Sequence, residues 1–379
     1  MKIFQCQACE QPLHFEHARC ESCERPVGYD PLRTDLVALE PEGEAWRAFA
    51  EPASRYRLCA NAGFGACNWL VPAASGESYC LACRHNRVVP DLSVDWNLVR
   101  WREIEVAKRR LFYSMLRMNL PLADRRSDPA GLAFDFLVDP SEAHLLGPPV
   151  LTGHDNGLIT LNLAEADDVE RERRRTLFGE HYRTLLGHFR HEIGHYFWNV
   201  LVRHDPCLPR FRAVFGDERA DYGLALQRHY AHGPGEGWQE HFVSSYATSH
   251  PWEDFAETWA HYMHIVDTLE TASSFGLRVE PKLRTGLDLG ARIDLDPYRH
   301  EFGRLIEAWL PLTFAMNSLN RSMGQSDLYP FRLTPSVIGK LSFVHDRIAA
   351  RPDSNDSIAD TLRALIAGLR QRVASPRYA

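Results

Sequence analysis

The spacing of apolar side chains separates the chain into stretches with different predicted structure. Over residues 93–119 they recur at helical spacing, which predicts a helix with Ser93 as its N-cap and an end before Pro121. The stretches 132–139 (LAFDFLVD) and 157–163 (GLITLNL) are short and mostly apolar, as strands are. These two strands indicate a small sheet near the middle of the chain.

Helical periodicity dominates from there to the end of the sequence. It predicts helices over 181–202, 252–264, 335–349 and 357–373, with Pro335 in the first turn of the third. The N-terminal quarter, by contrast, has no long periodic stretch and is interrupted by Gly and Pro. The sequence therefore predicts an α+β protein in four parts: a cysteine-rich module over 1–90, a linking helix within 91–130, a mainly helical domain with a small sheet over 131–315, and C-terminal helices over 316–379.

Composition places the chain among folded globular proteins. Of its 379 residues 45% are hydrophobic, which is ample for a core and excludes wholesale disorder. It carries 43 Lys and Arg against 50 Asp and Glu, so it is not expected to coat nucleic acid or an anionic membrane. No run approaches the roughly eighteen apolar residues of a membrane span, and the first residues lack the apolar segment of an export signal.

Eight of the nine cysteines lie before residue 84, where they form two quartets. The first quartet is Cys6, Cys9, Cys20 and Cys23, and the second quartet is Cys59, Cys67, Cys80 and Cys83. In a Cys-x-x-Cys turn two thiolates converge on one Zn²⁺, and two such turns complete a closed tetrahedral site. We therefore expect two structural zinc sites and, because clustered thiolates persist in a reducing compartment, a cytoplasmic protein.

Two questions about the quartets stay open at this level. Cys59 and Cys67 are spaced more widely than a Cys-x-x-Cys turn, so one of them could be an ordinary buried thiol. Cys6 and Cys9 could also share a metal ion with the last pair of the second quartet. Residues 1–90 carry nine Lys or Arg and eleven Asp or Glu, and thiolate-bound zinc adds negative charge, so protein docking is expected of this module rather than nucleic-acid binding.

The stretch 181–202 contains the sequence His191-Glu192-Ile193-Gly194-His195, a match to the HExxH motif. Histidines at positions i and i+4 lie on one face of a helix, so both imidazoles can bind one metal ion. Zinc lowers the pKa of a bound water to about 7, and Glu192 can accept its proton. The motif therefore predicts a catalytic zinc centre with Glu192 as the general base.

A third protein ligand must come from outside this helix. The metzincin pattern would need Gly at 198 and His at 201, where this chain has Trp198 and Leu201. In 252–264 (WEDFAETWAHYMH), Glu253 and Glu257 stand at i and i+4, which favours Glu253 as the ligand and Glu257 as the carboxylate that orients an imidazole N–H. Five other side chains could compete for the metal: Asp254, His261, His264, Glu218 and Asp221.

Together these motifs resemble a bacterial family of zinc-binding metallopeptidases of gluzincin type that carry an N-terminal zinc ribbon. The resemblance runs through the first quartet, the later cysteines, 191-HEIGH-195 and 251-PWEDFAETWAHYMHIVDTLETA-272. It covers most of the chain to about residue 350, and it implies a zincin-like fold for the helical domain and a double zinc ribbon for residues 1–90.

The second half also looks like the catalytic domain of anthrax lethal-factor-type gluzincins. In those proteins the first Glu of an E-x-x-A-E helix is the third ligand, and a Tyr seven residues upstream assists the oxyanion. The resemblance gives these roles to Glu253 and Tyr246. A phenol at that place can donate to the developing negative charge, and His250 and His241 are the alternatives to Tyr246.

We therefore expect a zinc metallopeptidase that acts on a peptide or protein substrate and holds one catalytic and two structural zinc ions. The alternative is a zinc-stabilised protein-interaction module, which docks partners through its zinc ribbons and C-terminal helices without peptidase turnover. The intact Glu192 favours the peptidase, because a purely structural metal site needs no base beside its ligand.

Overall fold

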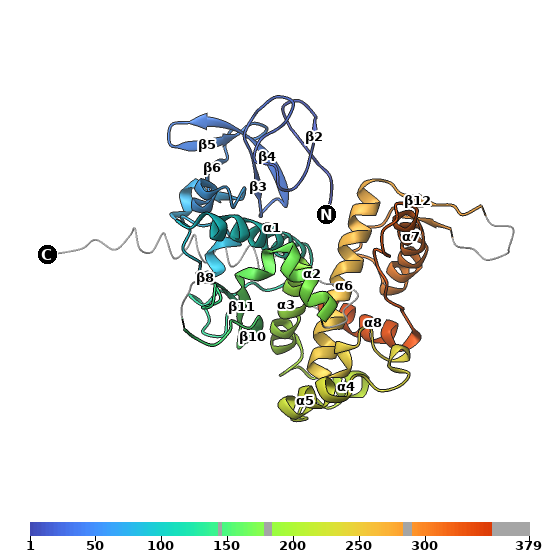
Figure 1. The fold of residues 1–379 in the computed structure, drawn as a ribbon. Helices are drawn as coiled ribbons and strands as arrows, with labels where there is room; N and C mark the ends of the chain where they lie inside the picture. Colours follow the sequence, from blue (N-terminus) through green and yellow to red (C-terminus); the bar gives the residue numbers. More distant parts are fainter. Residues whose placement is uncertain (143–145, 178–183, 283–289, 351–379) are drawn as a thin grey trace. The chain divides into compact units, whose positions relative to one another are not determined.

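The computed structural model describes residues 1–142, 146–177, 184–282 and 290–350 (Figure 1). Within these ranges the chain divides into two compact units. The N-terminal unit is made of Ile3–Thr152 and Asn156–Ala166, and the C-terminal unit is made of Met1–Lys2, Gly153–Asp155 and Asp167–Ala350. Helices and small sheets occur together, so the prediction of an α+β protein is confirmed.

A five-stranded antiparallel sheet is the framework of the N-terminal unit. Its strands lie in the order β3 (Val27–Asp30), β4 (Asp35–Glu42), β5 (Ala45–Ala48), β6 (Arg55–Leu58) and β7 (Leu70–Pro72). A separate antiparallel pair, β1 (Phe4–Gln5) and β2 (Pro12–Leu13), flanks the first Cys-x-x-Cys turn. Short strands joined by tight turns explain why this quarter of the sequence has no helical periodicity.

Buried aromatic rings join the cysteine-rich segment to α1 (Asp95–Arg117). The ring centroid of Tyr29 lies 4.7 Å from that of Trp69 and 4.9 Å from that of Phe15. Tyr113 of α1 lies 5.5 Å from Phe15, and all four rings are buried. Burying each large side chain contributes about 2 kcal/mol, so α1 and the cysteine-rich segment share one hydrophobic core.

The start of α1 differs from the prediction in one detail. Val94, not Ser93, is the N-cap, and no side chain caps the helix there. The Ser93 hydroxyl and amide both donate to Asp91 Oδ1, at 2.6 and 2.9 Å. The predicted cap was wrong because Asp91 forms a local turn that competes for the same polar groups.

Three strands of the N-terminal unit run parallel. β9 (Ala133–Leu137) pairs with β11 (Leu158–Asn162) and with β8 (Asn86–Val88). The strands predicted over 132–139 and 157–163 are therefore confirmed. Ala133, Phe134 and Phe136 of β9 and Ile159 and Leu161 of β11 are buried, which accounts for the mostly apolar sequences of these strands.

The C-terminal unit is mainly helical. Its helices are α2 (Asp168–Leu177), α3 (Leu185–Leu201), α4 (Leu208–Phe215), α5 (Tyr222–His232), α6 (Pro251–Ser274), α7 (Phe302–Ser322) and α8 (Pro335–Ala349). Helices α3 and α6 pack side by side (Figure 1), with Phe197 stacked on Trp259 at 5.0 Å between centroids. Strands β12 (Arg278–Val279) and β13 (Ala291–Arg292) pair, and β10 (Gly153–Asp155) lies beside α3.

The helix predictions for this unit are confirmed where the structure describes the chain. The helix predicted over 181–202 corresponds to α3, that over 252–264 lies within α6, and that over 335–349 is α8, which begins at Pro335. The helix predicted over 357–373 lies outside the described residues. Within the described ranges, each helix is too short or too polar to cross a membrane.

Candidate metal centres

The close packing of α3 on α6 depends on a glycine inside the HExxH motif. A Cβ atom on Gly194 would lie 2.9 Å from Ala256 Cα and 3.1 Å from Trp259 Cβ. Gly194 therefore lets the two helices approach at nearly backbone distance. That approach brings Glu253 and Glu257, which lie on either side of Ala256 in α6, to the histidines of α3.

Three potential ligand atoms meet between these helices. Glu253 Oε2 lies 3.0 Å from His191 Nε2 and 3.4 Å from His195 Nε2, and the two Nε2 atoms are 3.2 Å apart. Tetrahedral ligands about 2.0–2.1 Å from a zinc ion are separated by about 3.3 Å. The three side chains, here called the His/Glu centre, thus already have the spacing of ligands around one ion.

The lone pairs of His191 Nε2 and Glu253 Oε2 are available to a metal ion at the His/Glu centre. His191 Nδ1 donates to Glu257 Oε1 at 2.7 Å, so the lone pair of the neutral ring is on Nε2, toward the centre. Glu253 is 1% exposed, and its Oε2 accepts no hydrogen bond from any residue that the structure describes. A buried carboxylate oxygen without a donor is unfavourable unless a cation binds it, and two His and one Glu suit zinc.

A second carboxylate fixes the orientation of His191. Glu257 accepts from the ring at Oε1, and Ser244 Oγ donates to its Oε2 at 2.6 Å. Burial alone would raise the pKa of Glu257, but the bond from His191 prevails and lowers it to about 2. Glu257 is therefore an anion that holds the imidazole in the tautomer required for metal binding.

Glu192 lies beside His191 on α3, is 9% exposed and is absent from the ligand cluster. Burial raises its pKa, while His191 and His195 act in the opposite direction. A carboxylate whose pKa is raised towards neutrality is a better proton acceptor.

Two tyrosines adjoin the His/Glu centre. The Tyr246 ring centroid is 5.9 Å from that of His191, and the Tyr222 hydroxyl donates to Glu253 Oε1 at 2.7 Å. Partial shielding from water and the nearby Glu253 raise the pKa of both phenols well above the usual range, so both keep their protons at neutral pH. The sequence did not predict a role for Tyr222, because a lone phenol has no diagnostic spacing.

The competing ligands named from the sequence have other partners. These are the pairs Asp254–Lys340, His261–Tyr329, His264–Arg190 and Glu218–Arg212, and the bond that Asp221 accepts from the Leu224 amide. His250 accepts from the Trp252 amide at Nδ1, and its Nε2 lies 3.1 Å from the Ala220 carbonyl oxygen, so both ring nitrogens are engaged. His241 is exposed, and its carbonyl oxygen accepts from Lys340 Nζ.

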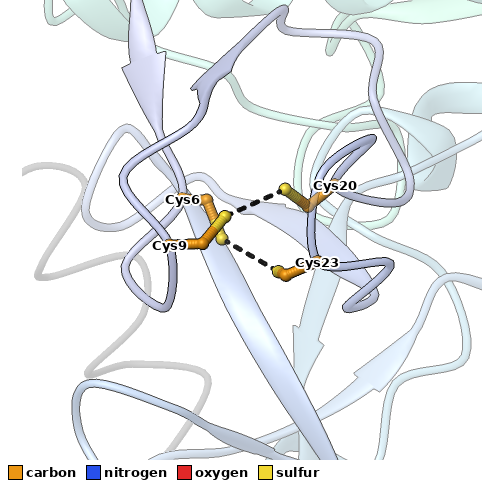
Figure 2. Close-up of side chains that lie close together, drawn as sticks. All are labelled: Cys6, Cys9, Cys20 and Cys23. Atoms are coloured by element: carbon orange, nitrogen blue, oxygen red, sulfur yellow. Dashed lines mark hydrogen bonds between the residues drawn. The ribbon is translucent and has the colours of Figure 1, made fainter.

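The first quartet forms one compact sulfur cluster (Figure 2). Cys6 Sγ lies 3.7 Å from Cys23 Sγ, and Cys9 Sγ lies 3.5 Å from Cys20 Sγ. These separations exceed the bond of about 2.05 Å in a disulfide and approach the roughly 3.8 Å between thiolates that share one zinc ion. The four side chains therefore fit a closed tetrahedral site.

Both Cys-x-x-Cys turns of the first quartet have the same backbone. The amide of Glu10 donates to the Cys6 carbonyl at 2.9 Å, and that of Glu24 donates to the Cys20 carbonyl at 2.9 Å. Glu10 and Glu24 each follow the second cysteine of a pair and have positive φ, 64° and 57°. A repeated local turn thus presents each pair of thiols in the same way.

The second quartet is fully buried and contains all four cysteines that the sequence suggested. Backbone amides of Trp69, Cys80 and Cys83 donate to sulfur atoms of the quartet at 3.4 Å. The side chains of Cys67, Cys80 and Cys83 hold the pKa of Cys59 well below its usual range. Cys59 and Cys67 therefore lie in one cluster with the last pair, and the two quartets do not interleave.

Comparison with known proteins identifies both parts of the chain. A family model described as "Putative zinc-binding metallo-peptidase" matches residues 97–347, and one described as "zinc-ribbon domain" matches residues 3–94. Uncharacterized proteins of Mycobacterium tuberculosis and Mycobacterium bovis are 43% identical over 347 residues, which cover 91% of this chain and 94% of each relative. No solved structure matches this chain. The prediction of a zinc-binding metallopeptidase family member with an N-terminal zinc ribbon is confirmed.

Proposed function

This chain belongs to the family of zinc-binding metallopeptidases, and we propose that it hydrolyses peptide bonds at the His/Glu centre. The observation that carries the proposal is the convergence of His191, His195 and Glu253 around one point, with Glu192 buried beside them. A purely structural site would not need a carboxylate next to its ligands. Three protein ligands also leave a tetrahedral ion one position for water or substrate.

The residues of α3 and α6 would have different roles in peptide hydrolysis. His191, His195 and Glu253 would hold the zinc ion, which when bound supplies a Lewis acid that polarises the peptide carbonyl and acidifies water. Glu192 would accept a proton from the attacking water and pass it to the departing amine nitrogen. Burial raises the pKa of Glu192, which favours this exchange near neutral pH.

Two further side chains complete the proposed site. Tyr246 lies next to His191 and keeps its proton, so its hydroxyl can donate to the negative charge that develops on the carbonyl oxygen. Glu257, anchored by Ser244, would keep His191 oriented throughout the reaction.

The two quartets would hold zinc in closed structural sites. Four thiolates fill a tetrahedral coordination sphere and leave no position for water, so catalysis is not expected there. The full chain should then bind three zinc ions, one of them at the His/Glu centre.

The substitution Glu192→Gln tests the proposal. It keeps the shape of the side chain but removes the proton acceptor, so cleavage of a quenched-fluorescence peptide library should fall by about 10²–10⁴-fold. Zinc content measured by mass spectrometry should remain at three ions per chain. Cleavage by the variant at the wild-type rate would contradict the proposed function. A wild-type protein that holds all three zinc ions but cleaves no peptide would also contradict it, and would favour a metal-stabilised interaction module.

A further inference from the structure

The two oxygens of Glu253 have different surroundings. Oε2 faces the two histidine Nε2 atoms and accepts no hydrogen bond from the described residues. Oε1 accepts a 2.7 Å hydrogen bond from the Tyr222 hydroxyl. A carboxylate can bind a metal ion through one oxygen or through both, and here the oxygen that does not face the two histidine Nε2 atoms is the one bonded to the phenol.

Tyr222 is held beside the N-terminus of α6, where Glu253 lies. Its ring packs edge-on against His250, 5.3 Å between centroids, and against Trp252, at 5.9 Å. His250 is the N-cap of α6, and its Nε2 is within 3.1 Å of the carbonyl of Ala220, two residues before Tyr222. The start of α5 is therefore tied to the start of α6 by His250 and by Tyr222 itself.

The helix that carries this phenol is otherwise weakly packed. None of the residues of α5, all of which the structure describes, is buried. Its N-cap is Asp221, which accepts from the Leu224 amide at 2.8 Å, and its C-cap is Gly233, which has positive φ. A helix with little buried surface has low local stability, so its contacts with α6 matter for its position.

We propose that Tyr222 is a positioning residue that makes Glu253 bind the metal through Oε2 alone, and that the seating of α5 on the start of α6 sets the metal affinity of the His/Glu centre. With Oε1 bonded to the phenol, the carboxylate cannot turn to offer both oxygens, and the fourth position stays open. The inference rests on the metal centre of the proposed function but not on turnover.

Zinc affinity of the full chain tests this inference. The zinc ion of the His/Glu centre is removed by brief chelation, while the thiolate sites keep theirs, and rebinding is measured against a competing chromophoric chelator. Tyr222→Phe should weaken rebinding by about 10–100-fold, the usual effect of losing a partner that orients a ligand. Tyr230→Phe, the same substitution at a 66% exposed position of α5, should leave the affinity unchanged.

Two additional measurements separate positioning from a general loss of structure. Co²⁺ added to the emptied His/Glu centre should show an altered visible absorption in Tyr222→Phe, because the carboxylate rotates, while far-ultraviolet circular dichroism stays as in the wild type. Asp221→Ala removes the N-cap of α5 but leaves the hydrogen bond from Tyr222 to Glu253 in place. It should lower the zinc affinity of the His/Glu centre by a smaller factor than Tyr222→Phe.

Wild-type zinc affinity and Co²⁺ absorption in Tyr222→Phe would overturn the inference. Equal losses in Tyr222→Phe and Tyr230→Phe would also overturn it, because the hydroxyl bonded to Glu253 would then have no special role. A wild-type protein that binds zinc but cleaves no peptide would contradict the proposed function and leave this inference standing.

Discussion

The thiolate quartets and the His/Glu centre assemble their ligands in different ways. In the first quartet each pair of sulfurs comes from one tight turn, and both turns use the same backbone geometry. At the His/Glu centre, two ligands come from α3 and the third from α6, and their meeting depends on close helix packing at Gly194. The pairs of the first quartet are thus organised by a repeated local turn, and the His/Glu centre by tertiary structure.

The proposed zinc ions would therefore have different roles in the two units of the chain. The N-terminal unit has short strands, so thiolate-bound zinc would supply much of its folding free energy. The C-terminal unit has a large core in which Phe197 stacks on Trp259, and that core does not require an ion. Zinc would stabilise the fold in one region and serve chemistry in the other.

Loss of one thiolate should give the largest effect. Cys80 lies in the buried second quartet, 3.7 Å from Cys67, and Cys80→Ser would lose the zinc ion of that quartet. Because structural zinc contributes about 10 kcal/mol or more, which is comparable to the whole stability of a domain, the N-terminal unit should unfold. Zinc content and thermal unfolding followed by near-ultraviolet circular dichroism report this loss.

Two comparisons sharpen that result. Cys207→Ser, outside both quartets, should keep three zinc ions and the wild-type melting temperature. His195→Ala should lose only the ion of the His/Glu centre and keep its helices folded. If His195→Ala unfolds as completely as Cys80→Ser, the contrast between a structural and a chemical metal is wrong.

The buried ion pair beside the second quartet should give the next largest effect. Lys108 Nζ lies 2.7 Å from Glu105 Oε1, neither side chain is exposed, and Glu105 Oε2 is 3.6 Å from Cys83 Sγ. Lys108→Met would leave the buried Glu105 carboxylate without its ammonium partner and next to a thiolate, at a cost of about 3–5 kcal/mol in unfolding free energy. Urea unfolding measures the loss.

Arg110→Met on the same helix is the matched control for Lys108→Met. Its partner is Glu16, and both side chains are partly exposed, 43% and 29%. Removing this pair should cost less than about 1 kcal/mol. Similar losses in the two variants would show that the Lys108 charge has no particular relation to the thiolate cluster.

A smaller effect is expected where the two helices of the C-terminal unit meet. In Gly194→Ala the new methyl group would lie 2.9 Å from Ala256 Cα, so α3 and α6 must move apart. We expect a loss of about 1–3 kcal/mol in stability together with weaker zinc binding at the His/Glu centre. Gly339→Ala in α8, where nothing lies within 4 Å, should instead be neutral or stabilise by about 0.5–1 kcal/mol.

The smallest effect concerns the hydroxyl behind the second carboxylate. Ser244→Ala removes the 2.6 Å hydrogen bond to Glu257, so His191 is held less firmly and zinc affinity should fall about tenfold. Ser249→Ala loses a hydroxyl that donates to the Tyr246 carbonyl rather than to Glu257 and should bind zinc normally. Chelator competition distinguishes them, and equal affinities would exclude a role for the Ser244 hydroxyl.

The sequence predicted four of the eight described helices and two of the described strands, because each of these has a local signal. Apolar periodicity located α1, α6 and α8, and Pro335 marked the start of α8. The predicted N-cap of α1 was wrong because the Ser93 hydroxyl donates to Asp91 instead of capping the helix. Whether Ser93 caps the helix or bonds Asp91 is decided by the geometry of the turn. The five-stranded sheet was not predicted, since its short strands have little periodicity of their own.

The sequence by itself determined the parts of both kinds of site that a single turn or helix fixes. Cys-x-x-Cys spacing brings two sulfurs together within one turn, and HExxH spacing places His191 and His195 on one face of α3. Only the tertiary structure decided that Glu253 meets them, that Cys59 and Cys67 join the second quartet, and that Tyr222 bonds Oε1 of Glu253. The physical reason is that these contacts join segments far apart in the chain, and their geometry follows from packing between elements rather than from residue spacing within one.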